Sequence, residues 1–170
     1  MARAWKRTRG HTAWMIMGAL LIATMATERV QAQQWTRTVS AYTDSSTTPT
    51  ELIFGVHPAA TDSVDADLGD VEAPPPPPGS SFFAQFKPEP AYQGLFEGLL
   101  TDIRGTRTGE TDTLTVKFSS PVAIQLDVTF EWNAAAIAQA CTAARIEDAF
   151  GGLVVAADML DTSRVVVDTG

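Results

Sequence analysis

The clearest pattern in the sequence is an alternation of apolar and polar residues between positions 122 and 132. Apolar side chains occupy every second position, and mostly polar ones lie between them. The apolar positions are Val122, Ile124, Leu126, Val128, Phe130 and Trp132. A period of two indicates a β-strand with one face on a hydrophobic core, because successive side chains point to opposite sides of a sheet. We therefore expect a strand over 122–132, with Trp132 in the core.

A second alternating run lies just upstream, where Leu114, Val116 and Phe118 are separated by a threonine and a lysine. Residues 119–121 (Ser-Ser-Pro) stand between the two runs and are typical of a turn. The pattern predicts an antiparallel hairpin formed by these two strands.

Shorter segments also have the composition of strands, and turn residues lie between them. They are residues 35–40, 51–56, 82–86, 153–158 and 164–168. Gly151 and Gly152 supply a turn before the fourth of these segments. Many short strands joined by turns are typical of an antiparallel β-sandwich, which is the fold class we expect. The alanine-rich segment after Trp132 favours a short helix or helical turn on propensity.

The first 32 residues have the organisation of a secretory signal peptide. A basic start that includes Arg3 and Arg9 precedes an apolar run over 13–26, and Val30 and Ala32 place small residues before a cut. The apolar run is shorter than the ~20 residues that a membrane-spanning helix needs, which disfavours the alternative of an N-terminal anchor. We expect cleavage after Ala32, and a mature chain over 33–170 that is one domain without a membrane span.

Net charge excludes some classes of partner. The whole chain carries 20 acidic and 12 basic residues, a formal charge of −8. The predicted leader removes five basic residues and one acidic residue, so that the mature chain has a formal charge of −12. An acidic domain is not expected to bind nucleic acid, because phosphate contacts require a basic face. Cys141 is the only cysteine, which excludes an internal disulfide and a zinc site made of cysteines.

Several segments between residues 50 and 168 together resemble a known type of module. They are 52–56 (LIFGV), 60–62 (ATD), 65–70 (DADLGD), the prolines at 74–78, 82–86 (FFAQF), 101–104 (TDIR), 132–133 (WN), 146–152 (IEDAFGG) and 158–159 (DM). The chain resembles modules of exported proteins from Bacteroidota and related bacteria, which often carry a type IX secretion (type A) sorting domain. The resemblance implies an immunoglobulin- or fibronectin type III-like sandwich, with a strand over 145–148 and the Gly151–Gly152 turn between two strands.

The same resemblance bears on localisation. Such proteins continue into a C-terminal sorting tail, and no such tail follows the module before Gly170. We expect an exported protein that is extracellular or at the cell surface, or periplasmic if there is no tail.

One acidic cluster is a candidate metal site. Asp62, Asp65, Asp67 and Asp70 lie within nine residues. Clustered carboxylates suit calcium, which takes six to eight oxygen ligands. The spacing differs from that of an EF-hand loop, because Gly69 stands where a further acidic residue is required. The alternative is a solvated loop whose aspartates cap turns.

Catalytic and ligand-binding residues are harder to name. Cys141 and His57 are the only thiol and imidazole of the mature chain, but no nucleophile motif surrounds either, and a buried structural cysteine is the alternative to catalysis. Aromatic residues that are candidates for a sugar-binding face, or for core packing, are Phe82, Phe83, Phe86, Tyr92 and Phe96. The proline-rich segment 73–79 is either a stiff connector or a polyproline ligand for a partner's aromatic groove.

The function expected from these observations is that of a non-catalytic exported module, working as a spacer, adhesion or surface-associated domain. No cofactor is expected. The alternatives are a carbohydrate- or protein-binding module, with a cell-surface protein or polysaccharide as its partner, and a small secreted hydrolase that uses two carboxylates.

Overall fold

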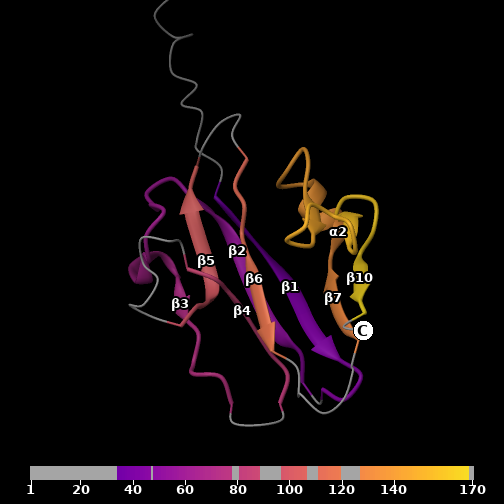
Figure 1. Ribbon diagram of the computed structural model, residues 1–170. Coiled ribbons are helices and arrows are strands. Elements are labelled where there is room, and N and C mark those ends of the chain that lie inside the picture. The colour runs from indigo at the N-terminus through magenta and orange to yellow at the C-terminus, as the bar shows by residue number, and fades with distance from the viewer. Residues whose placement is uncertain are drawn as a thin grey trace, which may run out of the picture. The chain divides into compact units, whose positions relative to one another are not determined.

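A computed structural model describes residues 34–46, 48–77, 81–88, 97–106, 111–119 and 127–168 (Figure 1). The predicted signal peptide lies outside these residues. The strands are β1 (Trp35–Thr43), β2 (Thr50–His57), β3 (Val71–Glu72), β4 (Phe83–Phe86), β5 (Leu99–Gly105), β6 (Val116–Ser119), β7 (Val128–Trp132), β8 (Arg145–Glu147), β9 (Ala156–Asp158) and β10 (Arg164–Val167). A 3-10 helix, η1 (Ala66–Leu68), and an α-helix, α2 (Ala134–Ala138), complete the described part. The fold is all-β, as the sequence predicts.

Most strands belong to one mixed sheet with the order β10-β7-β1-β2-β5-β4-β6. β3 adds to β5 outside this path, and β8 and β9 form a separate two-stranded sheet. β2 and β5 pair in parallel, whereas the other pairs are antiparallel. The expectation of a purely antiparallel arrangement was wrong at this pair. A parallel neighbour needs a long crossover, and the segment between β2 and β5 provides it.

The sheet curls, so that its two ends approach each other. β6 ends the strand order on one side and β7 lies next to the opposite end, yet the rings of Phe118 and Phe130 are 5.9 Å apart in an edge-to-face contact. In Figure 1, β6 lies in front of the layer that contains β1 and β2. The buried core lies inside this curl and consists of Val39, Ala41, Leu52, Ala84, Phe86, Leu99, Val128, Phe130, Trp132, Ile137 and Met159.

The predicted hairpin was wrong. β6 pairs with β4, and β7 pairs with β1 and β10, so the two neighbouring runs in the sequence belong to different parts of the sheet. Residues 120–126 lie outside the described part, and the predicted strand over 122–132 is confirmed for Val128–Trp132. Alternation specifies which face of a strand is buried, but it does not specify the strand with which it pairs.

Strands were found near every other predicted segment, with shifts at their ends. The strand expected at 145–148 is β8, and the short helix expected after Trp132 is α2, where the side chain of Asn133 accepts a hydrogen bond from the amide of Ala136. Gly151 and Gly152 both have positive φ, as a tight turn between two strands requires. No helix in the described part of the chain is long and apolar enough to cross a membrane.

β5 was not predicted as a strand, although it lies in the interior of the sheet. Five of its seven residues are buried, and they include Asp102 and Arg104. The strand therefore shows no alternation of apolar and polar residues, which is the signal that sequence reasoning uses. Its two buried charged residues begin the candidate site.

Candidate functional site

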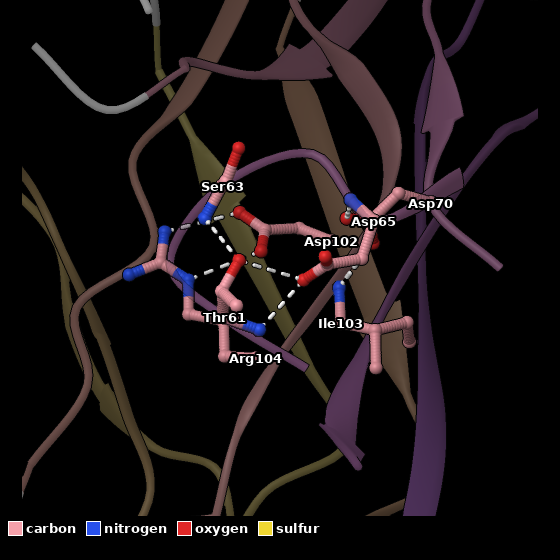
Figure 2. Close-up of polar contacts among 7 residues, drawn as sticks. All are labelled: Thr61, Ser63, Asp65, Asp70, Asp102, Ile103 and Arg104. Atoms are coloured by element: carbon pink, nitrogen blue, oxygen red, sulfur yellow. Dashed lines mark hydrogen bonds and ion pairs between the residues drawn. The ribbon is translucent and has the colours of Figure 1, made fainter. Parts of the chain in front are cut away.

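Two segments that are far apart in the sequence meet at β5. The loop after β2, residues 58–70, folds against the strand that carries Asp102, Ile103 and Arg104, as Figure 2 shows. Both segments contain motifs on which the resemblance to exported modules rests. We call this set of seven residues the loop–strand cluster: Thr61, Ser63, Asp65, Asp70, Asp102, Ile103 and Arg104.

Asp65 organises the loop itself. One oxygen of its carboxylate, Oδ2, accepts hydrogen bonds from the amide of Thr61 at 2.6 Å and from the hydroxyl of Thr61 at 2.9 Å. The amide of Ser63 donates to the same hydroxyl oxygen at 3.0 Å (Figure 2). Asp65 is therefore a turn-forming residue, which is the alternative that the sequence left open.

Asp70 joins the loop to the strand. Its Oδ2 accepts a hydrogen bond from the amide of Asp65 at 2.7 Å, and its Oδ1 accepts one from the amide of Ile103 at 2.6 Å. Burial raises the pKa of the Asp70 carboxyl, and the two amide hydrogen bonds oppose that rise. The bond to Ile103 matters for folding, because a buried amide left without a partner is costly.

Asp102 and Arg104 form a buried ion pair on one face of β5. Nε of Arg104 lies 3.1 Å from Oδ1 of Asp102, and a terminal guanidinium nitrogen of Arg104 lies 3.0 Å from Oδ2. The side chains are only 10% and 9% exposed. Their spacing of two residues explains the pairing, because alternate residues of a strand point to the same side. This bidentate geometry holds both charges in place.

The structure places the four predicted calcium ligands in one loop but uses them differently. Asp65 and Asp70 belong to the loop–strand cluster, while Asp62 and Asp67 are exposed. Among the residues that the structure describes, no three His, Cys, Asp or Glu side chains are grouped so that they could hold a metal ion. The calcium site stays a prediction.

His57 and Cys141 come from different elements and have separate environments. Nδ1 of His57 accepts a hydrogen bond from the amide of Ala59, at the turn after β2. Cys141 follows α2 and is half-buried, rather than fully buried as expected of a structural cysteine. Burial raises the pKa of the Cys141 thiol, and nearby Arg37 opposes the rise. A raised pKa disfavours the thiolate that a nucleophile needs.

The candidate aromatic face belongs in part to the core. Phe86 is buried within it, and Phe82 packs against it from the side. Phe83 is half-buried on β4, and Tyr92 and Phe96 lie outside the described residues. In the proline-rich segment, residues 74–77 are exposed and irregular, whereas residues 78 and 79 are not described.

A second feature, which sequence reasoning did not single out as a site, is the turn between β8 and β9. We call residues 148–155 the Asp148 loop. Oδ2 of Asp148 accepts hydrogen bonds from the amides of Val154 and Val155, both at 2.7 Å, and Oδ1 accepts one from the amide of Phe150 at 2.7 Å. The amides of Val155 and Val154 are the main reason that the pKa of Asp148 falls to about 2.

The Asp148 loop presents apolar side chains to solvent. Phe150, Leu153 and Val154 are 74%, 83% and 69% exposed. Gly151 and Gly152 make the turn possible with φ of 78° and 82°. The sequence signal was a Gly-Gly pair beside an aspartate and a short apolar run, but hydrophobicity alone predicts that such a run is buried.

Comparison of the chain with protein-family models, with curated proteins and with solved structures found no match. The two features with the most developed geometry are thus the loop–strand cluster, whose groups bind one another, and the Asp148 loop, whose apolar groups face outward.

Proposed function

We propose that this chain is a non-catalytic, exported interaction module that binds a protein partner through the Asp148 loop. The observation that carries the proposal is the exposure of Phe150, Leu153 and Val154 on a turn that Asp148 holds in shape. Clustered apolar groups on a surface are typical of interaction sites. Export is supported by the leader pattern of the first 32 residues.

The turn is suited to binding because its conformation exists before a partner arrives. The carboxylate of Asp148 accepts hydrogen bonds from amides on both sides of the exposed residues. A preorganised loop loses less conformational entropy on binding than a free one, so more of the energy of apolar contact is available as affinity.

A protein partner with an apolar recess fits this loop better than a membrane or a sugar. Glu147 and Asp148 place acidic groups at its base, and the whole chain has a formal charge of −8, so an anionic lipid surface repels it. Leu153 and Val154 are aliphatic, whereas sugar-binding faces use aromatic rings together with polar groups. The projecting side chains instead resemble anchors that enter a pocket.

We also propose that the fold is a β-sandwich of the immunoglobulin or fibronectin type III-like class, as the resemblance to exported modules implies. The contact between Phe118 and Phe130, from opposite ends of the strand order, supports two facing layers. The loop–strand cluster supports a structural role for the resembling motifs, because Asp70 and Arg104 are held in internal contacts.

The proposal is tested by site-specific photo-crosslinking in the cells that produce the protein. A photoreactive phenylalanine analogue at Leu153 is expected to capture a specific protein, and the same analogue at exposed Val71 on β3 is the matched control. The captured protein is then purified, and its affinity for the chain is measured by calorimetry.

The substitution Leu153→Asp is expected to weaken that affinity at least about tenfold, which corresponds to about 1.4 kcal/mol. Val71→Asp should leave it unchanged. Capture of the same proteins from both positions, or an affinity that Leu153→Asp does not alter, would contradict the proposal.

A further inference from the structure

β10 is an edge strand whose free side is chemically self-complementary. Among the described strands it pairs only with β7, in an uninterrupted antiparallel register from Arg164 to Val167. Its sequence with the next residue, Arg164-Val165-Val166-Val167-Asp168, has opposite charges at equal distances from a central valine. Val165 and Val167 pack against the core, whereas Arg164, Val166 and Asp168 are exposed.

The backbone groups on the free side can be identified from the register with β7. The amide of Trp132 donates to the carbonyl of Ser163 at 2.9 Å, so residue 163 directs its polar groups toward β7. Hydrogen-bonded positions alternate along an antiparallel pair, so Val165 and Val167 also face β7. The amide and carbonyl groups of Arg164, Val166 and Asp168 consequently point away from it, at the open edge.

A second copy of β10 fits this edge in one register. A two-fold axis beside Val166 places this valine opposite its own counterpart, and each Arg164 opposite the Asp168 of the other copy. Each of these cross-strand pairs can exchange backbone hydrogen bonds, because all the residues concerned expose their polar groups at the edge. Opposite charges and paired β-branched side chains on directly opposed positions stabilise a sheet.

The other end of the sheet has a protection that β10 lacks. β6 carries Lys117 as an exposed residue, and edge lysines are a common means of preventing contact between strands. β10 contains no lysine or proline, and its exposed centre is Val166, which is 40% exposed. Such an edge is open to strand addition.

We propose that two copies of this chain associate through antiparallel pairing of their β10 strands about Val166, which makes one continuous sheet across the dimer. The symmetry is isologous, since each copy supplies the same surface. One short strand from each copy is a small contact beside the about 1,200–2,000 Å² of a stable interface, so the dimer is expected to dissociate on dilution.

The test is the oligomeric state of the purified chain, measured by sedimentation velocity over a wide range of concentration. A reducing agent is present, so that a disulfide between Cys141 residues cannot link the copies. A reversible monomer–dimer equilibrium is expected. Val166→Lys should weaken the dimer at least about tenfold, because two ammonium groups then face each other at the axis. Val71→Lys, at an exposed valine of β3, is the matched control and should leave the equilibrium unchanged.

A charge exchange tests the register itself. Arg164→Asp should weaken the dimer, because it opposes Asp168 of the other copy with a like charge. Arg164→Asp combined with Asp168→Arg should restore the dimer, since the opposite charges are again paired. Thermal unfolding shows whether each variant is folded. A chain that stays monomeric at every concentration, a dimer that survives Val166→Lys, or a double variant no stronger than Arg164→Asp would each overturn the proposal.

Discussion

At the scale of the residue, two aspartates show how surroundings set the ionisation of one side-chain type. Asp148 accepts amide hydrogen bonds with little burial, and its pKa falls to about 2. Asp70 also accepts amide hydrogen bonds, but burial is the larger effect there and raises its pKa. Hydrogen bonds to the charged form and loss of solvent act in opposite directions, and exposure decides which dominates.

The low pKa of Asp148 predicts a specific pH dependence of stability. Because the folded state lowers this pKa, the ionised carboxylate stabilises the fold above the pKa of the unfolded chain. That contribution is lost as the pH falls through about 2. Asp148→Asn is therefore expected to lower the unfolding temperature at pH 7, and the difference from the unsubstituted chain should vanish near pH 2. Circular dichroism melts between these values measure it.

Glu147→Gln is the matched control for this experiment. Glu147 is the next residue along the chain, and its ion pair with Arg145 is exposed, so its removal should change the unfolding temperature little at any pH. A difference between Asp148→Asn and the unsubstituted chain that persists unchanged at low pH would contradict the assignment.

At the scale of the element, the loop–strand cluster attaches residues 58–70 to β5. The attachment combines the hydrogen bond from Ile103 to Asp70 with the ion pair of Asp102 and Arg104. A loop of this length loses considerable conformational entropy when it is ordered, and buried polar contacts in good geometry offset that loss. The motif residues at 61–70 and 101–104 are thus accounted for by folding, without an assigned reaction.

Removal of one partner of the buried ion pair should be strongly destabilising. Arg104→Met leaves the carboxylate of Asp102 buried without its counterion, which typically costs about 3–5 kcal/mol. Asp102→Leu combined with Arg104→Met removes both charges and is expected to recover much of that loss. Urea unfolding measures the free energies. A loss below about 1 kcal/mol for Arg104→Met, as for an exposed pair, would show that the cluster does not fasten the loop.

At the scale of the whole molecule, the curl of the sheet brings its ends together around one core. Phe130 on β7 meets Phe118 on β6, and Phe118 also meets Phe82, with ring centroids 6.4 Å apart. Trp132 fixes the neighbouring region, because its indole nitrogen donates to the carbonyl of Met159 at 2.9 Å. Edge-to-face aromatic pairs of this kind add to the energy of apolar burial.

The curl predicts energetic coupling between two strands that are not neighbours in the sheet. A double-mutant cycle of Phe118→Leu and Phe130→Leu should give a coupling energy of about 0.5–1.5 kcal/mol from denaturant unfolding. As a control, Phe118→Leu combined with Val71→Ala should be additive, because Val71 is an exposed residue of β3. Coupling close to zero in the first cycle would contradict the facing arrangement.

The β character of this chain follows from local sequence. Alternation in β1 and β7 and the Gly151–Gly152 turn are local signals, and the structure confirms them. Asp65 and Asp70 were also identified from sequence as members of a polar loop, with turn-capping as one of two interpretations. Each of these features depends on residues close together in the chain.

Pairing, burial of charge and exposure of the Asp148 loop were decided only in the tertiary structure. β6 and β7 have similar alternation but different partners, because backbone donors and acceptors are the same in every strand. Asp102 and Arg104 are buried because a loop some forty residues earlier, anchored by Asp70, folds over them. Phe150 and Leu153 are exposed although they are apolar, because solvent exposure depends on which distant segments cover a residue, and no local pattern encodes that.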